Sequence, residues 1–176
     1  MRNEPGDEKR HSRKRRLAAL GASVAGAMAL VIGTGTNAFA VNQVEAFSSA
    51  TPDWSCGQAV ESWTMELVFQ CDGNLVLYRL SDYYPVWATG TNGKGITRVD
   101  FSASAGAIVL YKGSTSFCAV GAFQWDGVHN VSEAVGGYAD VQDDGNFVIY
   151  NISNKAVWAS GTTNNHVGSR EDCHSW

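Results

Sequence analysis

A nine-residue segment that occurs twice constrains the fold of this chain more than any other feature. Residues 70 to 78 read Gln-Cys-Asp-Gly-Asn-Leu-Val-Leu-Tyr and residues 142 to 150 read Gln-Asp-Asp-Gly-Asn-Phe-Val-Ile-Tyr, so six of the nine positions are identical. Each copy is followed by a second shared piece, Val-Trp-Ala-Thr-Gly-Thr from residue 86 and Val-Trp-Ala-Ser-Gly-Thr from residue 157. Duplication explains both similarities, so the sequence predicts an array of related units.

A weaker third copy lies between the other two. Residues 103 to 111 read Ala-Ser-Ala-Gly-Ala-Ile-Val-Leu-Tyr, with Gly, Val and Tyr at the same offsets. Tyr78, Tyr111 and Tyr150 are 33 and 39 residues apart, which gives a repeat of about 35 residues. That length suits a small sheet of three or four strands, so we expect three such sheets.

The composition favours an all-β protein of one domain. The chain has 176 residues, of which 44% are apolar and 17% charged, with 19 Gly and 6 Trp. These values exclude a large multidomain enzyme and argue against disorder or a charge-rich helical bundle.

Alternation with period two runs through each copy of the repeat and indicates a strand. In the first copy this alternation places Gln70, Asp72, Asn74, Val76 and Tyr78 on one face, and Cys71, Gly73, Leu75 and Leu77 on the other, buried face. The Asp-Gly pair is typical of a hairpin turn. Because the alternation continues through it, we predict instead one strand with a local bulge at Gly73 and Gly145.

The first 40 residues have the layout of a secretory signal. Arg13-Lys14-Arg15-Arg16 precedes the apolar residues 17 to 32, and Ala38-Phe39-Ala40 has the small-x-small pattern of a cleavage site. We therefore predict residues 1-40 as a signal peptide cleaved after Ala40, residues 41-176 as the mature domain, and a secreted, extracellular location. A membrane anchor is the alternative, but about 20 strongly apolar residues are needed to span a bilayer.

The charge of the mature chain limits its partners. The leader carries seven basic and three acidic residues, so residues 41 to 176 carry six basic and 14 acidic residues, a net charge of 6 − 14 = −8. An acidic body without a basic stripe repels phosphate backbones, so we expect no nucleic-acid partner and no membrane insertion of the mature chain.

All four cysteines, Cys56, Cys71, Cys118 and Cys173, follow the predicted cleavage point. An even number of cysteines in an exported chain predicts two disulfides, with three possible pairings. Their spacing does not match that of a zinc site, and we expect no metal and no cofactor.

The polar face of the repeated segment carries hydrogen-bonding groups at a regular spacing. Amide, carboxylate and phenol groups recur at about 6.5 to 7 Å, which is two strand residues. Each hydroxyl of a sugar both donates and accepts, so such an array suits a neutral polyhydroxylated ligand. An ordinary solvated sheet face is the alternative, but two copies with the same five residues favour a ligand site.

Repeated Gln-x-Asp-x-Asn-x-Val-x-Tyr followed by Trp-Ala-(Ser/Thr)-Gly-Thr resembles the bulb-type mannose-binding lectins, known from monocot plants, bacteria and fungi. The resemblance covers roughly residues 56 to 165. It implies a β-prism II fold, with three four-stranded antiparallel sheets around a pseudo-threefold axis, one potential mannose site per sheet and no metal requirement.

The resemblance also implies a role for each residue of the motif. Asp72 and Asn74 would bind the axial 2-hydroxyl of mannose, Gln70 the 3-hydroxyl and Tyr78 the 4-hydroxyl, with Val76 against the ring carbons. The same roles in the third sheet would fall to Asp144, Asn146, Gln142, Tyr150 and Val148. The middle copy has Ala103, Ala105 and Ala107 at the polar positions, so we expect two sites rather than three.

By the same resemblance, Trp87 and Trp158 would fill the centre of the prism. In the middle repeat either Val120, at matching spacing, or Trp125, from a longer segment, would take that place. Many plant relatives carry a cysteine at the position of Cys71, but their partner cysteine has no counterpart here. Cys56 is then the nearest candidate for Cys71, which would leave Cys118 with Cys173.

The function predicted from these observations is a secreted, non-enzymatic carbohydrate-binding protein. A lectin-like bacteriocin and a scaffold or inhibitor with weak sugar affinity are the alternatives. Adjacent acidic residues such as Asp143-Asp144 fall on opposite faces of a strand and do not form an acid/base pair. A homodimer that exchanges terminal strands is also compatible with the sequence.

Overall fold

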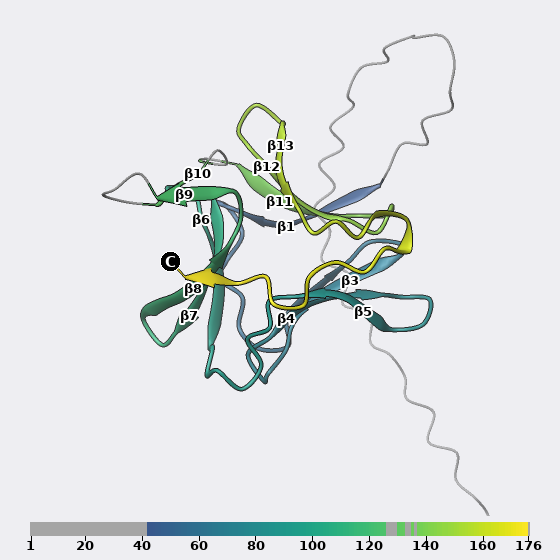
Figure 1. Ribbon diagram of the computed structural model, residues 1–176, viewed down its shortest axis with the longest axis horizontal. Coiled ribbons are helices and arrows are strands. Elements are labelled where there is room, and N and C mark those ends of the chain that lie inside the picture. The colour runs from purple at the N-terminus through teal and green to yellow at the C-terminus, as the bar shows by residue number, and fades with distance from the viewer. Residues whose placement is uncertain (1–41, 126–129, 133–134, 136, 176) are drawn as a thin grey trace, which may run out of the picture. The chain divides into compact units, whose positions relative to one another are not determined.

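Three four-stranded antiparallel sheets form the framework of the described part of the protein, as the repeat predicts (Figure 1). The computed structural model describes residues 42–125, 130–132, 135 and 137–175. The predicted signal peptide, its cleavage point after Ala40 and the terminal residue Trp176 lie outside the described residues. All described residues belong to one compact unit, Ala38–Trp176.

The three sheets correspond to the three repeats. Sheet I has the order β2-β3-β4-β5, sheet II the order β14-β8-β7-β6, and sheet III the order β1-β11-β12-β13. A further pair of short strands, β9 and β10, follows sheet II along the chain, and a single 3-10 turn, η1, follows sheet III. The elements are β1 (Gln43–Ser48), β2 (Ala59–Glu61), β3 (Met65–Phe69), β4 (Leu75–Arg79), β5 (Tyr84–Ala88), β6 (Arg98–Ser102), β7 (Ala107–Lys112), β8 (Thr115–Val120), β9 (Phe123–Trp125), β10 (Asn130–Ser132), β11 (Tyr138–Gln142), β12 (Phe147–Tyr150), β13 (Ala156–Ala159), η1 (Thr163–Asn165) and β14 (His174–Ser175).

Alternating side chains of the central strands form the core between the sheets. The inward positions of β4, β7 and β12 are all fully buried and belong to one apolar cluster: Leu75 and Leu77, Ile108 and Leu110, Phe147 and Ile149. Because successive strand residues point to opposite faces, the valine between each pair points outward. The alternation read from the sequence therefore holds within these strands.

Each end of the described chain adds a strand to a sheet that another repeat forms. Strand β1 pairs with β11, which completes sheet III, and β14 pairs with β8 in sheet II. The C-terminal segment, yellow in Figure 1, first runs beside β5, where the Gly168 amide donates to the Val86 carbonyl at 2.8 Å. All these terminal contacts are made within one chain.

Tryptophans occupy the centre of the prism in two of the three sheets. Trp87 is fully buried, and its ring lies 5.6 Å from that of Phe147 and 5.8 Å from that of Trp158. Trp158 is partly buried against the same cluster. Trp54 is buried near the start of the domain, with its ring 4.5 Å from that of Phe47.

The middle sheet places a disulfide where the other two sheets place a tryptophan. Leu77 pairs with Trp87 and Ile149 pairs with Trp158, whereas the equivalent Leu110 pairs with Cys118. Of the two alternatives for this place, Val120 was wrong, because Val120 pairs with Ile108, two residues before Leu110 on the same strand. The side chain of Trp125 lies outside the described residues.

Two disulfides join the four cysteines. Cys56 is bonded to Cys71 and Cys118 to Cys173, which confirms the expected pairing. Cys118 is 3% exposed and packs with Cys173 against the core. Cys71 is exposed, so its predicted place on the buried face was wrong; it lies in a turn rather than in a strand.

Candidate functional site

The polar half of the repeated motif forms a hairpin turn rather than part of a strand. In sheet I, β3 ends at Phe69, which pairs with Leu75, and residues 70 to 74 connect the two strands. The Gly73 amide donates to the Gln70 carbonyl at 3.0 Å, and the Gln70 amide donates to the Asn74 carbonyl at 2.8 Å. Gly73 has a φ of +91°, a conformation that glycine adopts without a steric penalty. The predicted continuous strand with a bulge was therefore wrong, and the turn preference of Asp-Gly prevails.

The hairpin of sheet III repeats this geometry. The Gly145 amide donates to the Gln142 carbonyl at 3.1 Å, the Gln142 amide donates to the Asn146 carbonyl at 2.9 Å, and Gly145 has a φ of +98°. Two segments 72 residues apart in sequence thus fold into the same turn, which places the Gln, Asp and Asn of each motif at equivalent positions.

The aspartate of each turn is held by a local hydrogen bond. Asp72 Oδ1 accepts from the Asn74 amide at 3.0 Å, and Asp144 Oδ1 accepts from the Asn146 amide at 3.0 Å. Such a contact fixes the rotamer of a short acidic side chain in a turn. A carboxylate has about four acceptor positions, so most of its capacity stays available to a ligand.

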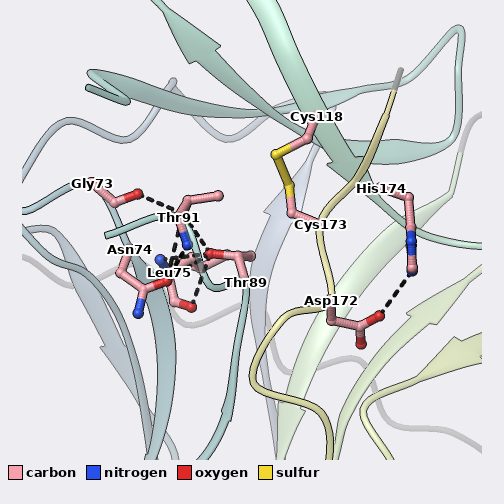
Figure 2. The surroundings of a disulfide bond; sticks show 9 residues. All are labelled: Gly73, Asn74, Leu75, Thr89, Thr91, Cys118, Asp172, Cys173 and His174. Carbon is pink, nitrogen blue, oxygen red and sulfur yellow. Dashed lines mark hydrogen bonds and ion pairs between the residues drawn. A yellow bond between two sulfur atoms is a disulfide. The ribbon is translucent and has the colours of Figure 1, made fainter. Parts of the chain in front are cut away.

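The asparagine of each turn is anchored from inside by the second repeated piece, as Figure 2 shows for Asn74. Asn74 Oδ1 accepts from Thr89 Oγ1 and from the Thr91 amide, both at 3.0 Å. Thr91 Oγ1 in turn donates to the Gly73 carbonyl at 2.7 Å. Because the amide oxygen is bound inward, the NH₂ group of Asn74 is the end left to donate outward.

The same anchor exists in sheet III and is absent from the middle sheet. Asn146 Oδ1 accepts from Ser160 Oγ at 3.0 Å and from the Thr162 amide at 3.3 Å. In sheet II the equivalent positions hold Ala107 and Val120, both fully buried, so the asparagine and its hydroxyl partner are lost together. The Ser/Thr-Gly-Thr piece had no role in the predicted site, although its recurrence after the motif was the available signal.

The glutamine and tyrosine of the motif are bonded to each other across each hairpin. Gln70 Nε2 donates to Tyr78 Oη at 2.9 Å, and Gln142 Nε2 donates to Tyr150 Oη at 2.6 Å. Burial raises the pKa of Tyr150, so its hydroxyl keeps its proton at neutral pH. The pair therefore offers a phenol donor beside an amide oxygen.

The valine of each motif lies on the outer face of its sheet, between the turn and the tyrosine. Val76 and Val148 are both 3% exposed, flanked by neighbouring strands. Each site thus combines a carboxylate acceptor, an amide donor, an amide–phenol pair and a small apolar surface. All ten motif residues are brought together as two sets of five.

The middle sheet offers no comparable surface. Six residues, 102 to 107, separate the paired Phe101 and Ile108, one more than the five residues 70 to 74 of sheet I. Ala107, Val109 and Ala119 form a small apolar cluster packed against Tyr111 and Phe123, so one residue of the chain's own β9 lies on this face. The Arg98 guanidinium lies 3.7 Å from the centre of the Tyr111 ring and forms an ion pair with Asp53.

An acidic residue distinguishes the outer face of sheet III from that of sheet I. Asp140, which is 2% exposed, pairs with Val148 and with Glu45, whereas the residue paired with Val76 in sheet I is Val68. Directly paired residues share a face, so Asp140 lies among the residues of the sheet III motif. Burial, with a smaller contribution from the charge of Glu45, raises the pKa of Asp140 from 3.8 to about 6.

Replacing Asp140 by asparagine should therefore remove a pH-dependent loss of stability. The folded state holds the proton of Asp140 more tightly than the unfolded chain does, so wild-type stability falls as pH rises from about 4 through 6. Urea unfolding of both proteins should show the Asp140→Asn variant gaining about 2 kcal/mol on the wild type between pH 4 and pH 8. A difference that does not change with pH would contradict this, and Glu45→Gln should reproduce the smaller part of the gain.

In the described part of the chain, no group of three or more His, Cys, Asp or Glu side chains is placed to hold a metal ion. None of the helices in this part has the length and apolar character needed to cross a bilayer.

Three antiparallel sheets around a common core, two of them carrying the same polar hairpin, define a β-prism of the lectin type. No protein-family model matches the chain, and no curated protein matches it. Among solved structures, a monomeric monocot mannose-binding lectin from Gastrodia elata is 33% identical, with 69% of this chain and 97% of that chain covered and a TM-score of 0.53.

Other similar structures come from a fungus and a bacterium. A Marasmius oreades lectin is 24% identical over 65% of this chain and 88% of its own, with a TM-score of 0.46. A domain-swapped lectin dimer from Mycobacterium smegmatis is 28% identical over 63% and 94%, with a TM-score of 0.33. On the Gastrodia match, the chain belongs to the bulb-type, monocot mannose-binding lectin family.

Proposed function

We propose that this protein is an exported, non-enzymatic lectin that binds mannose or mannose-containing glycans through two equivalent sites. Gln70, Asp72, Asn74, Val76 and Tyr78 form the first site, and Gln142, Asp144, Asn146, Val148 and Tyr150 form the second. The observation that carries the proposal is that two separate hairpins hold the same donors and acceptors through the same internal bonds.

The chemistry of each group fits one part of a mannose ring. The aspartate accepts from the axial 2-hydroxyl, to which the asparagine NH₂ donates. The glutamine and tyrosine bind the 3- and 4-hydroxyls, and the valine packs against ring carbons. Since the motif supplies both donors and acceptors to these hydroxyls, binding needs no Ca²⁺. The monocot relative from Gastrodia elata is itself described as mannose-binding.

Export is supported by the leader pattern and by the two disulfides, which persist in oxidising compartments. The lectin fold begins directly after the proposed cleavage point. The Asn42 carbonyl accepts from the Asp143 amide at 2.9 Å, and β1 starts at the next residue. Cleavage after Ala40 therefore leaves sheet III complete.

Calorimetry in the presence of a chelator tests the proposal. Protein recovered from the medium of an exporting bacterial host should have the mass of residues 41 to 176. It should bind mannose at two sites per chain. Added Ca²⁺ should leave the affinity unchanged. If mannose, mannobiose and high-mannose glycans all give no heat, a scaffold without sugar affinity would be the better interpretation.

A further inference from the structure

A cleft of about 490 Å³ lies beside the second site, between sheets I and III. One wall comes from the turn between β2 and β3, with Trp63 and Thr64, and from the end of β4, with Arg79. The other wall comes from the sheet III hairpin, with Asp143 and Asp144. The volume lies within the range of small-molecule sites and exceeds that of a single water-filled gap.

Trp63 is the most exposed large apolar residue in the described part of the chain. It is 82% exposed, whereas Trp54 is 6% and Trp87 is 0% exposed. Packing of the fold therefore does not require an indole at this position. An exposed aromatic ring at the edge of a cleft is a typical platform for a ligand with an apolar face.

The backbone that carries Trp63 is fixed to the sheet III hairpin. The Trp63 amide donates to Asp143 Oδ1 at 2.7 Å, and Thr64 Oγ1 donates to the Asp143 carbonyl at 2.8 Å. These two bonds join segments about 80 residues apart in sequence. The base of the platform is thereby held at a set position relative to the neighbouring residue, Asp144.

Asp144 belongs both to the cleft and to the proposed mannose site. Its Oδ1 is bonded to the Asn146 amide within the turn, so the carboxylate stands at the boundary between the two. A sugar bound through Asp144 would lie at the mouth of the cleft. The next residue of the same glycan then has a space to enter, with the indole on one side.

The charges around the cleft favour a neutral ligand. Arg79 is already paired with Asp82 at 2.7 Å, which leaves Asp143 and Asp144 as the unpaired charges of the lining. Two carboxylates repel an acidic sugar, while hydroxyl groups of a neutral sugar can donate to them. A neutral pyranose, with C–H groups on its faces and hydroxyls on its rim, matches this combination.

The first site has no equivalent support. The position that corresponds to Asp143 in the sheet I hairpin is Cys71, which is bonded to Cys56. No carboxylate stands there to hold a neighbouring turn. The two proposed mannose sites should therefore differ in how they treat longer glycans.

We propose that the cleft between Trp63 and Asp144 is an extension subsite for a second, neutral pyranose of a glycan whose terminal residue occupies the Asp144 site. This inference rests on the proposed mannose-binding function. It makes the second site selective for oligosaccharides and leaves the first site a monosaccharide site.

The test compares a disaccharide with a monosaccharide at each site separately. The Asp72→Ala background isolates the second site and the Asp144→Ala background isolates the first. In each, calorimetry gives the ratio of the Kd for methyl α-mannoside to the Kd for mannobiose. We expect a ratio of roughly five to ten at the second site and near one at the first.

Trp63→Ala should reduce the ratio at the second site to near one, and Trp63→Phe should retain most of it. Phe117→Ala, which removes another exposed aromatic residue in β8, serves as the matched control and should leave the ratio unchanged. A ratio that survives Trp63→Ala, or a loss that is equal for both sugars, would overturn the subsite. If neither sugar binds in either background, the proposed function itself fails, which is a distinguishable outcome.

Discussion

Asp72→Ala should reduce the number of mannose sites per chain from two to one, and Asp144→Ala should do the same through the other site. Each aspartate is the charged acceptor of its motif, held in place by the amide two residues on. Its loss leaves sugar hydroxyls without a partner, at a cost of about 1.5 to 3 kcal/mol, or more than tenfold in affinity. Calorimetric stoichiometry measures the effect, and the double variant should bind nothing.

Two control variants test whether binding depends on the aspartate charge and on the complete motif. Asp72→Asn keeps an oxygen that can accept from the Asn74 amide but removes the negative charge, so it should preserve the hairpin and still weaken binding. Ala105→Asp should add no third site, because Ala103 and Ala107 are also apolar and Phe123 packs against that face. If the double Asp72→Ala, Asp144→Ala variant still binds at two sites per chain, the assignment of function to these hairpins is wrong.

The fold could be predicted because the repeat carries its own strand pattern. Leu75 and Leu77 alternate with Val76, and the same order recurs in each copy, so the inward and outward faces follow directly from the sequence. The family resemblance then supplied the four strands of each sheet and the arrangement of the sheets around a common axis. The prediction failed at residues 70 to 74, because the alternation of polar residues was given more weight than the turn preference of Asp-Gly. In the structure, the hydrogen bond from the Gly73 amide to the Gln70 carbonyl and the positive φ of Gly73 identify a turn.

The position of Cys118 shows why spacing alone misaligned the middle repeat. Trp87 lies nine residues after Tyr78 and Trp158 lies eight after Tyr150, whereas Cys118 lies only seven after Tyr111. Loop length varies between repeats. The pairing of the strands is set by backbone hydrogen bonds and is therefore the better guide to equivalent positions. The Cys-Ala pair at this point was the available counterpart of Trp-Ala.

The Trp63 cleft and the pairing of Glu45 with Asp140 could not be predicted from the sequence, for a different reason. Both depend on which strands meet, and β1 pairs with a strand that begins about 90 residues further along the chain. No local pattern encodes such a pairing. It follows from which apolar face remains uncovered after the repeats have folded.

The two disulfides differ in what they hold together. Cys56–Cys71 closes a sequence separation of 15 residues and lies at the surface, next to the first hairpin. Cys118–Cys173 closes 55 residues and fixes the C-terminal segment against the core. That segment also brings Asp172 Oδ2 to 2.7 Å from the Nε1 donor of the buried Trp87 (Figure 2 shows Asp172 beside the disulfide).

Removing Cys118–Cys173 with a double Cys→Ala variant should therefore destabilise the protein more than removing Cys56–Cys71. Loop-closure entropy alone predicts losses of roughly 4 and 3 kcal/mol. The loss for Cys118–Cys173 should exceed its loop-closure value for two reasons. Cys118 stands where the other sheets pack an indole, and release of residue 172 leaves the Trp87 N–H buried without its partner. Urea unfolding followed by tryptophan fluorescence measures both losses, and thiol titration of the denatured wild type should find no free cysteine. Equal losses, or a larger one for Cys56–Cys71, would mean that the core contacts around Cys118 do not depend on its bond to Cys173.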